Sequence, residues 1–134
     1  MDRLLSAFAP RIPDAREFAL RHRVVLLWSK GRVGIDVALG ALPFEERCVE
    51  RASDWTIPPN SVLRTCCAED LVALKAFAGR PQDWIDIESV LVRQRRTLDW
   101  AMILGELAPL LELRGTPESL DTLATVRRKV EQGT

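Results

Sequence analysis

The chain has 134 residues, of which 47% are hydrophobic and 28% charged, and its 19 basic residues balance its 19 acidic ones. This length predicts one domain, 1–134, with the composition of an ordinary soluble globular protein. A net charge of zero argues against strong nonspecific binding to nucleic acid or to a membrane surface. We find no signal-peptide pattern and no apolar run near the ~20 residues that a membrane span requires, so we expect a cytoplasmic protein that does not bind membranes.

The cysteines and the single histidine limit the kinds of catalytic and metal-binding site that we expect in this chain. Cys66 and Cys67 are adjacent and Cys48 stands apart, whereas cysteines that share a metal ion are usually separated by a short turn. We interpret all three as buried, reduced thiols. Because His22 is the only histidine, we expect neither a histidine-based catalytic triad nor a metal cage, and we place His22 in a strand.

The N-terminal part of the chain, 1–66, is expected to be rich in strands. Residues 2–9 are typical of the end of a helix, and the apolar run 24–28 predicts a strand buried on both faces. Turn residues at 29–32 lead to a second strand at 33–39, so the two strands should form an antiparallel hairpin.

Asp36 lies in the middle of the second of these strands. Alternation places its side chain on the face opposite to those of Ile35 and Val37. A half-exposed strand with a solvated Asp36 explains this spacing, and a functional carboxylate is the alternative.

A helix at 44–53 is followed by two short strands, 55–57 and 61–66. The residues between them include Pro58 and Pro59, which should limit the pairing of these strands and favour a sheet edge.

The C-terminal part, 67–134, is predicted to be helical. Its first helix begins with Glu69 and Asp70, whose carboxylates complement the positive end of the helix dipole. The expected apolar stripe of this helix consists of Leu71, Leu74 and Ala78. Gly79 can end the helix in a left-handed conformation, and Pro81 suits the first position of the next helix.

The corner between these two helices is a candidate polar site. The expected buried face of the second helix consists of Trp84, Ile87 and Leu91. Asp83 and Asp86 lie three residues apart on a neighbouring face, close in sequence to Lys75 and Arg80. A surface ion pair between Lys75 and either carboxylate, worth only ~0–1 kcal/mol, is the simpler explanation of this cluster.

Two more helices complete the predicted fold. The apolar face of the helix at 99–113 consists of Trp100, Ile103, Leu104, Leu107 and Leu111. Pro109 should kink this helix or end it early, since an interior proline costs ~3 kcal/mol. Gly115 should stop it, and a last helix begins at 116–118. The predicted fold class is therefore α+β, with one small, mostly antiparallel (mixed) sheet over 18–66 and a helical C-terminal half packed against it.

The corner resembles a motif of the nucleotidyltransferases of the DNA polymerase beta superfamily, in the form found in AbiEii-like toxins and related bacterial families. That motif reads S-P-E-D-L-hydrophobic-x-x-K, followed by R-x-x-D-x-x-D. The residues that match are Glu69-Asp70-Leu71, Lys75, Gly79-Arg80, Asp83 and Asp86. Cys67 and Ala68 stand where the motif has serine and proline, which weakens the helix cap. The resemblance extends from the strand at 34–37 to the helical tail and implies a partial nucleotidyltransferase fold.

The resemblance implies roles for five residues. Asp36 would be a catalytic, metal-binding carboxylate that helps to activate the attacking hydroxyl group. Lys75 would contact the phosphates of a nucleoside triphosphate, while Arg80, Asp83 and Asp86 would shape the nucleotide-binding pocket. The acceptor of the nucleotide would be RNA or a protein.

Part of the family pattern is absent. Enzymes of this superfamily carry a Gly-Ser pair that opens a helix, followed by an Asp-x-Asp that holds two Mg²⁺ ions. Between Asp2 and Asp36 the only acidic residues are Asp14 and Glu17, and neither follows such a pair. The sequence therefore resembles a family member without its first strands, through truncation or a late start. With one carboxylate we expect no Mg²⁺ site and no activity unless another chain completes the site. The unpaired sheet edge favours a homo-oligomer or a protein partner.

Two other classes of function fit the sequence. A non-catalytic interaction module, either a toxin–antitoxin component or a regulatory partner, agrees with the missing motif and the zero net charge. A DNA-binding helix-turn-helix over 68–96 would use the arginines near its end, Arg93, Arg95 and Arg96. However, its second helix begins with Asp83 and Asp86, which repel phosphate where such helices contact DNA. A solvated basic helix end is the simpler interpretation of these arginines, and an RNA-facing patch is the alternative.

Overall fold

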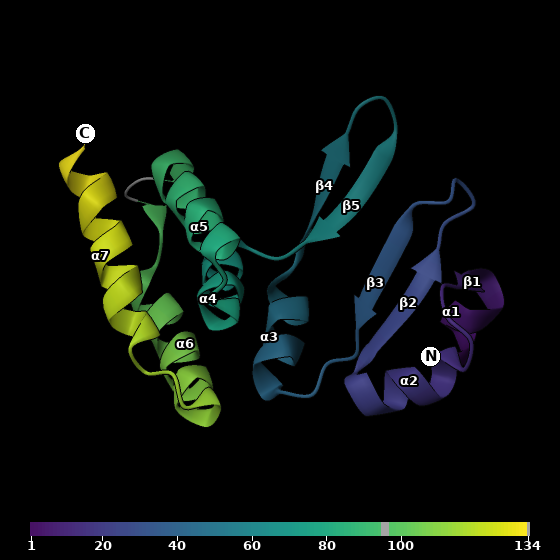
Figure 1. The fold of residues 1–134 in the computed structure, drawn as a ribbon. Coiled ribbons are helices and arrows are strands. Elements are labelled where there is room, and N and C mark those ends of the chain that lie inside the picture. Colours follow the sequence, from purple (N-terminus) through teal and green to yellow (C-terminus); the bar gives the residue numbers. More distant parts are fainter. Residues whose placement is uncertain (95–96, 134) are drawn as a thin grey trace. The chain divides into compact units, whose positions relative to one another are not determined.

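The computed structural model describes residues 1–94 and 97–133 and is an α+β structure, as the sequence predicts (Figure 1). The helices are α1 (Asp2–Ala7), α2 (Ala15–His22), α3 (Pro43–Arg51), α4 (Ala68–Ala78), α5 (Pro81–Gln94), α6 (Trp100–Arg114) and α7 (Ser119–Gln132). The strands are β1 (Ala9–Pro10), β2 (Val24–Trp28), β3 (Gly34–Ala38), β4 (Ser53–Ile57) and β5 (Ser61–Thr65). No helix in the described residues is long and apolar enough to cross a bilayer.

The chain divides into two compact units, Met1–Glu46 and Arg47–Thr134. The sequence predicts one domain over residues 1–134. We describe each unit by itself.

The first unit is built on an antiparallel sheet of order β1-β2-β3, which confirms the predicted hairpin of β2 and β3. Burial alternates along β2: Val25 and Leu27 are fully buried, while their neighbours are partly exposed. The prediction of a strand buried on both faces is therefore wrong. The buried face packs with Ala19 of α2 and with apolar residues of α1, so helices cover one face of this sheet.

His22 is the last residue of α2, so its predicted place in a strand is wrong. The segment Ala15–His22 places Ala15 and Ala19 on one buried face, a spacing of four that suits a helix lying on β2. Arg23 ends this helix in a left-handed conformation, and its N–H donates to the carbonyl of Ala19.

The boundary between the two units falls within α3, and the second unit contains a separate two-stranded sheet of β4 and β5. The predicted single sheet over 18–66 is therefore wrong, because β4 and β5 pair only with each other. Pro58 and Pro59 lie in the turn rather than in the strands, so all five residue pairs from Ser53↔Thr65 to Ile57↔Ser61 form. The helix predicted for 44–53 ends at Arg51.

The helical part of the second unit is centred on α4, which packs against α5, α6 and α7. Its buried apolar residues are Val72, Ala73 and Ala76, whereas the predicted stripe residues are only partly buried. A helix with three neighbours is buried on more than one face, so no single stripe defines its packing. The rest of this core consists of Ile87, Leu91, Leu98, Ile103, Leu107, Leu110, Leu111 and Leu123.

Pro109 lies inside α6, which continues to Arg114, so of the two expected effects of this proline, a kink or an early end, the early end does not occur. Buried residues lie on both sides of the proline, with Leu107 before it and Leu110 and Leu111 after it. Their burial keeps the chain helical despite the lost hydrogen bond and the steric cost of the ring. Gly115 ends the helix in a left-handed conformation, as predicted.

Pro109→Ala is expected to stabilise the chain by about 2 kcal/mol. Alanine restores a helical N–H donor and removes the clash with the carbonyl one turn earlier, although it also frees the unfolded chain slightly. Pro117→Ala, just before α7, is the control. Its free energy of unfolding should fall by about 0.5 kcal/mol, only because the unfolded chain gains conformational entropy. Urea unfolding of both variants measures the difference, and the same sign of change in both would contradict this account.

Candidate functional site

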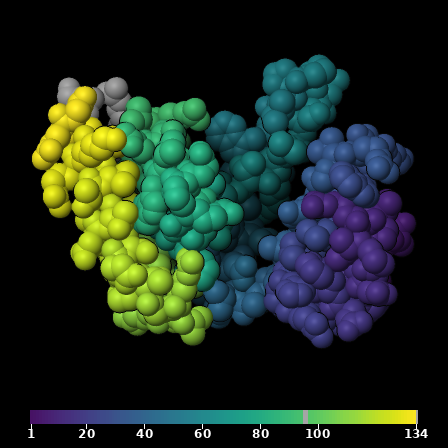
Figure 2. Space-filling model, viewed as in Figure 1, coloured from purple at the N-terminus to yellow at the C-terminus, as the bar shows by residue number. Residues whose placement is uncertain are grey.

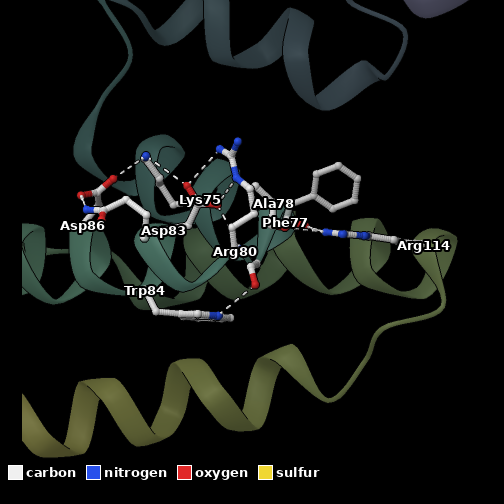
Figure 3. A network of polar contacts seen from close by, with 10 residues as sticks. Lys75, Phe77, Ala78, Arg80, Asp83, Trp84, Asp86 and Arg114 are labelled. Carbon is white, nitrogen blue, oxygen red and sulfur yellow. Dashed lines mark hydrogen bonds and ion pairs between the residues drawn. The ribbon is translucent and has the colours of Figure 1, made fainter.

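The corner between α4 and α5 brings together all four residues predicted for it (Figure 3). Gly79 ends α4 with a positive φ of 65°, and Pro81 begins α5, as predicted. Lys75, in the last turn of α4, has its Nζ 3.1 Å from Asp83 Oδ1 and 2.6 Å from Asp86 Oδ2. The two carboxylates therefore share one ammonium group.

Asp83 is the buried centre of this corner. Its Oδ2 accepts hydrogen bonds from the backbone N–H of Arg80 at 3.1 Å and from Arg80 Nε at 2.7 Å. The backbone contact is one half of a capping box, in which the third helical residue satisfies the N–H that precedes the helix. Asp83 lies on the same buried face as Ile87 and Leu91, so its predicted place on a neighbouring face is wrong.

The charges of the corner hold one another in their ionised forms. The Arg80 guanidinium, followed by the Lys75 ammonium, lowers the pKa of Asp83 well below its usual range, although burial opposes this. Hydrogen bonds from Lys75 and Gln82 lower the pKa of Asp86. The same contacts raise the pKa values of Lys75 and Arg80. Two cations and two anions leave the corner electrically neutral at pH 7.

Two further contacts hold the backbone of the corner. Trp84 Nε1 donates to the carbonyl of Gly79 at 3.2 Å, and Arg114 at the end of α6 donates to the carbonyls of Phe77 and Ala78 (Figure 3). These donors satisfy carbonyl groups that the end of α4 leaves unpaired. Side chains from both α5 and α6 therefore hold the backbone at the end of α4.

Asp36 belongs to the first unit, where it lies on the face of β3 that the helices do not cover. Its side chain is 61% exposed and pairs with Arg11. A single exposed carboxylate that already pairs with an arginine does not fit a Mg²⁺ site. Within residues 1–94 and 97–133, no group of three or more histidine, cysteine, aspartate or glutamate side chains is arranged to hold a metal ion.

A second polar cluster was not predicted. Asp70 is fully buried and accepts two hydrogen bonds from Arg51 of α3, at 2.6 Å and 3.1 Å. Arg51 and Arg47, one turn apart, also bind Glu106 of α6. The sequence separations of 19 to 59 residues hide this cluster from local pattern analysis. Only the arginine spacing of four on one helix signals it.

The three cysteines are free and lie close to this second cluster. Cys67 caps α4 by accepting from the N–H of Asp70 at 3.4 Å, so the helix keeps a cap where the family motif has serine. Burial raises the pKa of Cys48 to about 12 and that of Cys67 to about 11. Such thiols are protonated and poorly reactive at neutral pH.

Arg93 is exposed in the last turn of α5, as the basic helix end predicts, whereas Arg95 and Arg96 lie outside the described residues. Comparison with known proteins adds no assignment. No protein-family profile matches the chain, and no curated protein matches it.

Asp83→Asn should lower the melting temperature by several degrees at pH 7. Because the pKa of Asp83 is lower in the folded chain than the ~3.9 of the unfolded chain, its ionised form stabilises the fold above about pH 4. This contribution is lost as the pH falls through the folded pKa, so the two melting curves should converge in acid. Asp86→Asn, which alters a partly exposed carboxylate, is the matched control and should lower the melting temperature less. An equal decrease in both variants would contradict the conclusion that the burial of Asp83 makes its charge contacts more important.

Asp70→Ala should reduce the free energy of unfolding by about 2 kcal/mol. The change removes two hydrogen bonds between Arg51 and a buried carboxylate, although Arg51 keeps Glu106. Asp121→Ala alters an exposed carboxylate in the first turn of α7 and should cost less than ~1 kcal/mol, since only the dipole contribution is lost. Urea unfolding compares the two variants.

Proposed function

We propose that this chain is a nucleotidyltransferase-like domain of the bacterial cytoplasm that binds a nucleoside triphosphate at the α4–α5 corner. The observation that supports the proposal is the convergence of Lys75, Arg80, Asp83 and Asp86, the residues of the family motif, in one polar cluster. Residues that are separated on two helices gather there because Gly79 and Pro81 turn the chain sharply.

Lys75 and Arg80 are the proposed phosphate ligands. The side chain of Arg80 is 73% exposed, and its contacts with Asp83 use two of the five N–H donors of a guanidinium. Lys75 is less exposed, and two of the three N–H donors of its ammonium group already bind carboxylates, so we expect it to exchange one of them for phosphate. Asp86, the more exposed of the two, is the partner to be released, while Asp83 keeps the corner folded. We therefore expect modest affinity.

Transfer of the nucleotide by this chain alone is not part of the proposal. Asp36 is the one carboxylate that the family resemblance assigns to catalysis, and its present partner is Arg11. A Mg²⁺-dependent reaction on an RNA or protein acceptor requires a second chain that supplies the missing carboxylates. The outer edge of β3, which has no neighbouring strand in its sheet, is the proposed place for such a partner or a second copy to pair.

A non-catalytic interaction module is the second candidate, as a toxin–antitoxin component or a regulatory partner. The observation that favours it is the neutrality of the corner, because its two carboxylates already occupy Lys75. A helix-turn-helix that binds DNA ranks below both, since α5 begins with two ionised carboxylates.

Isothermal titration with each nucleoside triphosphate tests the proposal. We expect binding in the micromolar to millimolar range without Mg²⁺, weakened at least tenfold, about 1.4 kcal/mol, by Lys75→Ala. Lys129→Ala is the matched control, because Lys129 also pairs with a carboxylate, that of Glu88, on the same unit, and it should change affinity less than twofold. A requirement for Mg²⁺ would indicate that a second copy completes a metal site.

Absence of binding for every nucleotide would overturn the nucleotide proposal and favour the interaction module. Equal loss in the two lysine variants would show that binding is nonspecific attraction between the triphosphate and surface cations.

A further inference from the structure

The ribbon formed by β4 and β5 carries large apolar side chains that are about half exposed or more. Every residue of β4 is exposed, and so is every residue of β5 except Thr65. Figure 2 shows the residues of this ribbon in dark teal. A two-stranded ribbon with no covering layer is only marginally stable in water.

Three of the four large apolar side chains of the ribbon share one face, and the fourth, Val62, lies on the opposite face. Trp55 and Leu63 are directly paired across the strands, and Ile57 lies two residues from Trp55 on the same face. Trp55 is 64% exposed, and Leu63 and Ile57 are each about half exposed. The opposite face carries Asp54 and Arg64, which pair with each other. We call the first face the Trp55 face.

The distribution of charge identifies the kind of partner that this face fits. The Trp55 face has no charged side chain, so it offers no attraction to nucleic acid or to a charged peptide. The one cation of the ribbon strands is Arg64, which lies on the other face and is neutralised by Asp54. A second copy of the same face meets no like charge, and both copies keep their charged pair in water. The face is therefore complementary to itself.

The position of the apolar pair also suits a two-fold contact. Trp55 and Leu63 form the third of the five residue pairs of the ribbon, at its midpoint. In a two-fold interface the same patch occurs on both sides, and energetically important aromatic residues lie near its centre. Two ribbons stacked face to face at the usual ~10 Å would bring Trp55 against the partner's Leu63.

We infer that the Trp55 face of the β4–β5 ribbon is the contact surface of a weak, two-fold dimer of this chain. One face of a short ribbon buries far less than the ~1,200–2,000 Å² of a stable interface, so the dimer belongs to the transient class. Its formation covers the apolar face and supplies the second layer that a two-stranded ribbon lacks. The inference concerns a surface other than the β3 edge and does not depend on nucleotide binding.

Sedimentation velocity of the full chain from about 10 µM to 1 mM tests this inference. We expect the wild type to shift from monomer to dimer across this range. Trp55→Thr and Leu63→Thr, which keep a good strand former, should raise the dissociation constant at least tenfold. Val62→Thr is the matched control: Val62 is 61% exposed on the opposite face of the same ribbon, and its change should alter dimerisation less than twofold.

Circular dichroism of each variant shows whether it folds like the wild type. For the wild type, isotope-filtered nuclear Overhauser effects between Trp55 and the partner's Leu63 provide a second, direct readout that needs no variant. A monomer at every concentration would overturn the inference. So would a dimer that Trp55→Thr leaves intact, or one that Val62→Thr weakens equally, because each places the contact elsewhere.

Discussion

Burial of a charged carboxylate in the second unit is the constraint on which the candidate site depends. Asp83 lies on the packed face of α5, where an ionised group is tolerated only if donors surround it. Lys75 and Arg80 provide those donors, and the sharp turn at Gly79 brings them within reach. The polar residues of the corner are therefore part of its architecture as well as candidates for binding.

A second buried carboxylate, which also requires surrounding donors, connects α3 to the helices α4 and α6. Asp70 is the second buried carboxylate among the described residues, and Arg51 satisfies it from α3 while also binding Glu106 of α6. Helices α3, α4 and α6 are thus connected through charged hydrogen bonds. Buried charges contribute little net stability compared with apolar packing, but they are costly to leave unpaired, so they fix which helix faces meet.

The two surfaces discussed above differ in what they offer a partner. At the corner, every charged group has a protein partner, so a ligand that binds Lys75 competes with the carboxylates of Asp83 and Asp86. On the β4–β5 ribbon, Trp55 and Leu63 have solvent where a packed protein would have neighbours. A ligand at the corner is thus opposed by existing electrostatic contacts, whereas association at the ribbon is driven by removal of apolar area from water.

The sequence by itself determined the features that short-range rules govern. The hairpin of β2 and β3, the turn at Gly79 and Pro81, the end of α6 at Gly115 and the grouping of Lys75 with Asp83 follow from residues a few positions apart. Tertiary structure decided what depends on distant neighbours. It buried Asp83, paired Asp70 with Arg51 and separated β4 and β5 from the first sheet. These outcomes depend on packing and desolvation energies that sum over residues far apart in the chain, which local propensities do not contain.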